Sequence, residues 1–198
     1  MESVGSARPR GHTREPHLSA PPVSAFALAR PAPGSVLLGI DPGTAVLGYG
    51  AVVMAASRPR LVAAGAVRVP RKLGPAAGLA YLRAELDALL ARIAPAVVVV
   101  EQAFAARNVR SALRIGEARG VVLASAAASG AEVVQYPPAT VKKALVGSGG
   151  ADKTQVARMV AAGLGLAEPP TPLDATDALA LALTHVYKRS IGPRTIRK

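Results

Sequence analysis

The sequence contains no cysteine and few aromatic or imidazole side chains: two Phe, four Tyr and three His among 198 residues. The absence of cysteine excludes disulfide bonds, thiolate metal ligands and thiol catalysis, and it is typical of proteins in a reducing cytoplasm. No apolar run is long enough to cross a bilayer, and the N-terminal segment lacks the continuous apolar stretch of a signal peptide. We therefore expect a cytoplasmic protein that does not enter a membrane.

Acidic residues are also scarce, because 12 Asp and Glu stand against 24 Lys and Arg and leave a net charge of +12. This charge favours a polyanionic partner, with nucleic acid as the first candidate. Residues 188–198 carry five basic residues and no acid, which predicts a flexible basic tail. Residues 1–35 carry four Arg and two acids in a stretch rich in Pro, Ser and Gly. We expect a disordered basic extension there, or a start site assigned too early.

The intervening residues, 36–187, have the pattern of one α/β domain. Apolar and β-branched runs predict strands at 36–40, 47–55, 61–69, 96–100 and 132–136. Amphipathic or Ala-rich stretches predict helices at about 74–93, 109–129, 137–145, 152–164 and 172–188. The first three strands follow one another closely, as in an antiparallel meander, and strands then alternate with helices. This order predicts an α/β sandwich around a five-stranded mixed sheet.

Carboxylates occur at the ends of two predicted strands and at the start of the last helix. Asp41 ends the first strand before a Pro42-Gly43 turn, and Glu101 ends the fourth. In an α/β sheet the carboxyl ends of neighbouring strands share one crevice. Asp174 and Asp177 lie three residues apart, so they project from the same face of their helix. The four carboxylates are then able to converge at one edge of the sheet.

Taken singly, these acids have simpler interpretations: Asp41 as a cap of its own turn, Asp174 and Asp177 as complements of the helix dipole. Together, four bare carboxylates would repel one another, and divalent cations would relieve that repulsion. Oxygen ligands favour Mg²⁺ or Mn²⁺ over zinc. Two such ions about 3.5–4 Å apart activate water and stabilise the leaving oxygen in phosphodiester hydrolysis. The combination therefore predicts a divalent-metal site suited to phosphodiester hydrolysis.

Four segments at distinctive spacing carry a family resemblance. They are Gly39-Ile40-Asp41-Pro42-Gly43-Thr44, Val100-Glu101-Gln102-Ala103-Phe104, Ala118-Arg119-Gly120 and Asp174-Ala175-Thr176-Asp177-Ala178-Leu179-Ala180. Over roughly residues 36–187 the sequence resembles the RuvC family of bacterial Holliday junction resolvases. The resemblance implies a ribonuclease H-like three-layer α/β/α fold, a homodimer, and paired symmetric nicking of four-way DNA junctions in recombination and repair. It also implies a branch-migration complex as partner.

The resemblance further implies roles for individual residues. Two Mg²⁺ ions per site, replaceable by Mn²⁺, would be held by Asp41, Glu101, Asp174 and Asp177. Two lysines, Lys142 and Lys153, match basic residues that neutralise phosphate charge, and Lys153 would stabilise the transition state. Phe104 would stack on a base near the junction, with packing against the next helix as the alternative. Further DNA contacts are expected where that helix begins, at Arg107, Asn108, Arg110 and Arg114.

Three other expectations follow from the residues. The helix at 109–129 has small apolar side chains suited to a dimer interface, or alternatively to packing on the sheet: Val121, Val122, Ala124, Ser125 and Ala128. We expect His185 to be a packing residue rather than a ligand. A sugar-kinase or actin-like ATPase has a similar first motif, but it needs a second large lobe and a later Asp-x-Gly loop that this chain lacks. A junction-binding module without cleavage is the non-enzymatic alternative, against which the four acids argue.

Overall fold

The computed structural model describes residues 34–55, 58–102 and 109–190. The strands are β1 (Val36–Asp41), β2 (Val46–Met54), β3 (Pro59–Arg68), β4 (Val97–Glu101) and β5 (Glu132–Tyr136). The helices are α1 (Pro75–Ile93), α2 (Val109–Ala128), α3 (Pro138–Val146), α4 (Lys153–Leu164) and α5 (Leu173–Ser190). Each predicted element is present within a few residues of its expected bounds. The last helix runs to Ser190, so residues 188–190 belong to α5 and not to the predicted flexible tail, which was wrong at these three positions.

The five strands form one mixed sheet in the order β3-β2-β1-β4-β5. Strands β1, β2 and β3 pair antiparallel, as the short connections between them predict. Strand β4 pairs parallel with β1, and β5 pairs parallel with β4. This pairing confirms the predicted five-stranded mixed sheet. It also brings the carboxyl ends of β1, β4 and β5 to the same edge of the sheet.

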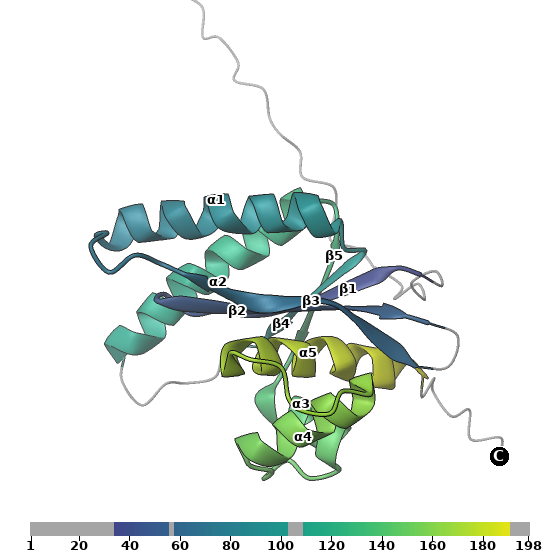
Figure 1. Ribbon diagram of the computed structural model, residues 1–198. Coiled ribbons are helices and arrows are strands. Elements are labelled where there is room, and N and C mark those ends of the chain that lie inside the picture. Colours follow the sequence, from purple (N-terminus) through teal and green to yellow (C-terminus); the bar gives the residue numbers. More distant parts are fainter. Residues whose placement is uncertain (1–33, 56–57, 103–108, 191–198) are drawn as a thin grey trace, which may run out of the picture.

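Helices cover both faces of this sheet, in three layers (Figure 1). Helices α1 and α2 pack on one face around a core that includes Leu38, Ile40 and Leu86. Helix α5 packs on the other face, with α3 and α4 beyond it, around a second core that includes Leu37 and Leu183. The two cores explain why β4 is a run of four valines, since both of its faces are buried. Within the described residues no helix is long and apolar enough to cross a membrane.

Helix α5 lies unusually close to β1 and β2 because glycine faces it at the crossing points. A Cβ atom on Gly39 would overlap the carbonyl oxygen of Ala178, and one on Gly48 would overlap that of Asp174. Any larger side chain would push α5 away from the sheet. The glycines of β1 and β2 thus set how near the acids of α5 come to the end of β1.

One residue of the dimer interface predicted on α2 is misplaced. Val122 is 0% exposed and packs between the sheet and α1, so it cannot contact a second subunit. The neighbouring residues Val121, Ala124 and Ala128 instead line a groove between α1 and α2 of about 820 Å³. Small apolar residues occur on both the core face and the groove face of this Ala-rich helix. The sequence pattern therefore did not distinguish one face from the other.

Candidate active site

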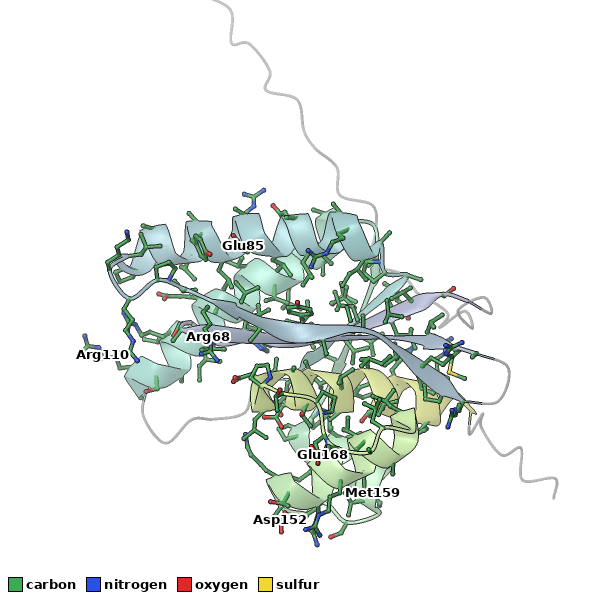
Figure 2. All side chains as sticks on the ribbon, viewed as in Figure 1. Arg68, Glu85, Arg110, Asp152, Met159 and Glu168 are labelled. Atoms are coloured by element: carbon green, nitrogen blue, oxygen red, sulfur yellow. The ribbon has the colours of Figure 1, made fainter. Side chains whose placement is uncertain are left out.

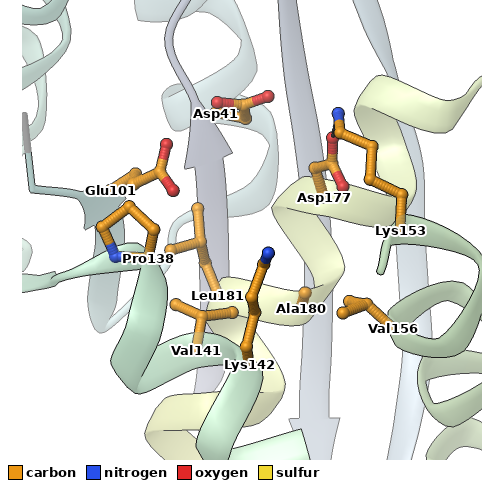
Figure 3. Close-up of a pocket in the computed structure, with 10 residues that line it drawn as sticks. All are labelled: Asp41, Glu101, Pro138, Val141, Lys142, Lys153, Val156, Asp177, Ala180 and Leu181. Carbon is orange, nitrogen blue, oxygen red and sulfur yellow. Dashed lines mark hydrogen bonds and ion pairs between the residues drawn. The ribbon is translucent and has the colours of Figure 1, made fainter. Parts of the chain in front are cut away.

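Two carboxylates lie at the edge of the sheet where neighbouring parallel strands end. Asp41 is the last residue of β1 and Glu101 the last of β4, directly after the paired residues Ile40 and Val100. Helix α5 brings Asp177 to the same place from the face below. Figure 3 shows the three carboxylates converging on one space. The strand ends and the glycine-mediated packing of α5 therefore produce the convergence expected from the sequence for these three acids.

The space between the carboxylates is a pocket of about 230 Å³. Lys142 reaches it from α3 and Lys153 from the first turn of α4 (Figure 3). The rest of its lining is apolar, from Pro138, Val141, Val156, Ala180 and Leu181. Three acids and two lysines, taken from five different elements, thus face one cavity.

The carboxylates carry more negative charge than their surroundings offset. The pKa of Asp41 is raised to about 6, first by burial and then by the charges of Asp177 and Asp174, which outweigh the opposing effect of Lys153. Burial also raises the pKa of Glu101, with Asp41 and Asp177 adding to the effect. Raised carboxyl pKa values from burial and like charge are typical of functional sites, where a bound cation or substrate supplies the missing charge.

Lys153 is fixed at the start of α4 by a capping box. The Asp152 carboxylate accepts a hydrogen bond from the backbone N–H of Gln155 at 2.8 Å, and the Gln155 side chain accepts one from the Asp152 N–H at 3.0 Å. The Lys153 Nζ lies 2.9 Å from Asp177 Oδ2, and this hydrogen bond raises the pKa of the ammonium group. Lys153 therefore stays protonated beside the acids.

The other predicted site residues lie farther from this pocket or outside the described residues. Asp174 does not line the pocket, although it is near enough to raise the pKa of Asp41. Arg110 projects from the start of α2 (Figure 2), and Arg114 lines a separate pocket beside the α1 start. Three predicted DNA contacts fall outside the described residues: Phe104, Arg107 and Asn108.

Two residues that support the site had no role predicted from the sequence. Arg119 of α2 donates from Nε to the backbone carbonyl of Glu101 at 3.1 Å and from its guanidinium to the Gln135 side chain. Tyr136 pairs with Glu101 across β4 and β5, and its carbonyl accepts the Gln102 N–H at 2.8 Å. The sequence did contain a signal for Arg119, because it is part of the Ala118-Arg119-Gly120 segment and is a charged residue within an Ala-rich helix. Both residues hold the end of β4 in place.

The pocket has the ligand chemistry of a divalent-cation site, but its acids are not closely grouped in this structure. Within the described residues no three Asp, Glu or His side chains are grouped closely enough to hold one ion, and the Lys153 ammonium stands against Asp177. However, the pocket presents carboxylate oxygens whose raised pKa values indicate uncompensated charge. Hard divalent cations prefer such oxygen ligands. Asp41, Glu101 and Asp177 would hold the cation, with Asp174 beside them.

Comparisons with known proteins place this fold and these residues in one family. Residues 37–185 match the family model of the crossover junction endodeoxyribonuclease RuvC. A RuvC of Heliobacterium modesticaldum is 47% identical over 157 residues, covering 79% of this chain and 97% of its own. The RuvC of Moorella thermoacetica is 45% identical over 150 residues, which cover 76% of this chain and 90% of its own.

Solved structures agree. Thermus thermophilus RuvC is 38% identical, with a TM-score of 0.72 over 79% of this chain and 96% of its own. The same protein in complex with a Holliday junction substrate also matches with a TM-score of 0.72. The yeast mitochondrial Holliday junction resolvase Ydc2, 16% identical, shares the fold with a TM-score of 0.61 over 80% of each chain. The chain belongs to the RuvC family of crossover junction endodeoxyribonucleases.

Proposed function

We propose that this protein resolves four-way DNA junctions by hydrolysing phosphodiester bonds in the pocket formed by Asp41, Glu101 and Asp177. The observation that carries the proposal is the set of three acids and two lysines facing one cavity in a chain of the RuvC family. Relatives of this family are crossover junction endodeoxyribonucleases, and one neighbour was solved with a Holliday junction. The net charge of +12 suits a DNA substrate.

The activity requires divalent cations, for which Mg²⁺ is the proposed species and Mn²⁺ a substitute. All four acids, Asp41, Glu101, Asp174 and Asp177, offer oxygen ligands of the kind these ions prefer. A pair of such ions lowers the pKa of water and stabilises the leaving oxygen in phosphodiester hydrolysis. Because Asp41 titrates near pH 6, it is ionised and able to bind a cation at neutral pH.

The two lysines of the pocket act on the phosphate. Lys153 stands at the mouth of the pocket with 79% of its side chain exposed, so its ammonium group is accessible to DNA while it holds Asp177. Lys142 approaches from another helix, α3 (Figure 3). Fixed cations at these points neutralise the charge that develops on a phosphate during hydrolysis. Additional phosphate contacts are proposed for Arg110 and Arg114, and a base-stacking contact for Phe104.

A homodimer would place two such sites on one junction and explain paired cuts. The groove between α1 and α2 is the proposed interface. It is lined by small and apolar side chains that include Leu90, Ala91, Val121 and Ala124. The Ser125 hydroxyl borders this groove but is itself buried, so the exposed side chains carry the proposed interface. A branch-migration complex is proposed as a further partner.

Cleavage of a mobile synthetic four-way junction tests the function. The wild-type protein should cut two symmetric strands with Mg²⁺ or Mn²⁺ and none with EDTA. Asp41→Asn and Asp174→Asn should bind the junction without cutting it, whereas Glu168→Gln, at an exposed acid that does not line the pocket, should cut normally. If the wild type bound the junction but did not cut it with either metal, the nuclease function would be rejected in favour of a junction-binding module without cleavage.

A further inference from the structure

A largely buried polar pair joins the end of β5 to α5, the helix that carries Asp177. The Tyr136 hydroxyl and His185 Nδ1 are 3.0 Å apart, and their rings are 6.1 Å apart between centroids. The two residues are 49 positions apart in the sequence. Tyr136 ends β5, and His185 lies two helical turns after Asp177 on α5. His185 is 1% exposed, as expected for a packing residue, yet both of its ring nitrogens have polar neighbours.

The neighbours of His185 fix the direction of its hydrogen bonds. Arg189 Nη1 lies 3.4 Å from His185 Nε2, and a guanidinium only donates, so Nε2 accepts. Burial and the Arg189 charge lower the pKa of His185 to about 4, so the ring is neutral at pH 7. Its single proton is therefore on Nδ1 and is donated to the Tyr136 oxygen. Arg189 is in turn 3.9 Å from the Glu132 carboxylate at the start of β5.

Tyr136 stands where the elements of the site meet. Its backbone pairs with Glu101, and its carbonyl accepts the Gln102 N–H at 2.8 Å. The next residues, Pro137 and Pro138, begin α3, on which Val141 and Lys142 face the pocket. The Lys188 ammonium lies 5.5 Å from the centre of the Tyr136 ring, so α5 holds this ring by two contacts. The position of Tyr136 thus affects Glu101 through β4 and Lys142 through α3.

We propose that the His185–Tyr136 hydrogen bond is a positioning contact that holds the corner between β5 and α3 against α5, and thereby sets Lys142 and Glu101 relative to Asp177. Neither ring lines the pocket, so neither residue is catalytic. This inference rests on the proposed nuclease function. A displacement of about 1 Å between reacting groups is able to cost on the order of 10²-fold in rate, so a looser corner should slow cleavage without weakening DNA binding.

Four variants test the positioning role. Tyr136→Phe removes only the hydroxyl, and His185→Leu removes the donor. His185→Asn retains an N–H near the position of Nδ1 and serves as the conservative rescue. The matched control is Tyr187→Phe, which removes a hydroxyl from the same helix as His185; this hydroxyl packs beside Gly163 of α4.

The readout is the single-turnover cleavage rate at saturating protein, together with the junction dissociation constant in EDTA. The rate should fall about tenfold in Tyr136→Phe and His185→Leu, within the range expected for a sub-ångström displacement. His185→Asn and Tyr187→Phe should remain near the wild-type rate, and all dissociation constants should be unchanged. Wild-type rates in both Tyr136→Phe and His185→Leu would overturn the positioning role and leave the nuclease function standing. If Tyr136→Phe failed to fold, the cleavage rates of His185→Leu and His185→Asn would be compared instead, because only the first of these variants lacks the hydrogen-bond donor.

Amide hydrogen exchange gives a second readout that does not depend on cleavage. Tyr136→Phe should accelerate exchange in α3, which follows the corner directly, and leave α4 unchanged. Equal protection of α3 in the variant and the wild type would overturn the inference. A wild-type protein that never cuts, combined with faster exchange in α3 of the variant, would instead reject the nuclease function and keep the structural contact.

Discussion

Gly39 of β1 lies directly against the carbonyl oxygen of Ala178 in α5, with no room for a Cβ atom between them. The obstacle is backbone and not a flexible side chain, so Gly39→Ala must displace α5. We expect this change to lower the free energy of unfolding by more than about 2 kcal/mol. Because α5 carries Asp177, cleavage should fall as well. Thermal and urea denaturation measure the loss of stability.

Gly116→Ala is the matched control for this prediction. Gly116 lies within α2, and nothing is within 4 Å of the position its Cβ would take. Alanine favours a helix over glycine by up to about 1 kcal/mol, so this variant should be slightly more stable than the wild type. A Gly39→Ala protein as stable as Gly116→Ala would contradict the close approach of α5 to the sheet.

The raised pKa of Asp41 predicts a pH dependence of stability in the absence of metal. Its pKa moves from 3.8 to about 6 on folding, chiefly by burial. Between these values the folded state binds more protons than the unfolded state, so this contribution makes stability fall as pH rises. Asp41→Asn cannot ionise, so this variant does not lose stability by this route as pH rises. In EDTA it should be more stable than the wild type by about 1–3 kcal/mol above pH 6, and equally stable below about pH 4.

The comparison is made by thermal denaturation from pH 4 to pH 8, with Glu168→Gln as an exposed-acid control. Adding Mg²⁺ at pH 8 should stabilise the wild type more than Asp41→Asn. A cation that binds the folded state raises its stability, and the variant lacks one of the proposed ligands. Parallel pH profiles for the wild type and Asp41→Asn would show that Asp41 titrates normally and would weaken the case for a cation in the pocket.

Most of the fold could be predicted because local signals agree with it. The four valines of β4, Pro75 at the start of α1 and the Asp152 capping box each fix one element without reference to the rest of the chain. The ends of β1 and β4 also placed Asp41 and Glu101 together, since parallel neighbours share an edge. These features require only the residue pattern and the rules of sheet topology.

The parts that escaped prediction depend on contacts between distant segments. Helical spacing put Asp174 and Asp177 on one face, but the packing of α5 against Gly39 and Gly48 decides that only Asp177 lines the pocket. The partnership of Tyr136 with His185 has no local signature, because each is a single residue in an apolar stretch. The roles proposed for the site residues stay predictions.

The groove between α1 and α2 predicts where dimerisation is sensitive to mutation. Ala124 is exposed and lines this groove, so Ala124→Arg should convert a dimer to a folded monomer. Ala88→Arg, at an exposed position of α1 that does not line the groove, should stay dimeric. Val122→Arg should instead unfold the monomer, because it buries a charge in the core. Sedimentation velocity separates these outcomes, and a dimeric Ala124→Arg would exclude the groove as the interface.

The ion pair between Lys153 and Asp177 leads to the sharpest prediction for catalysis. Lys153→Met should reduce the cleavage rate by about 10²–10³-fold, because it removes a fixed cation at the phosphate. Stability should change little, since the lysine is exposed and exposed ion pairs contribute at most about 1 kcal/mol. Lys143→Met is the matched control: Lys143 is exposed on α3 and does not line the pocket.

Single-turnover cleavage and junction binding distinguish two roles for this lysine. If Lys153 acts on the transition state, Lys153→Met should bind the junction in EDTA nearly as well as Lys143→Met, since each variant removes one positive charge from a protein of net charge +12. Only the Lys153 variant should lose cleavage. Equal cleavage by the two variants would mean that Lys153 contributes neither to the transition state nor to the orientation of Asp177. The role of charge stabilisation would then pass to Lys142, the other ammonium group that faces the acids.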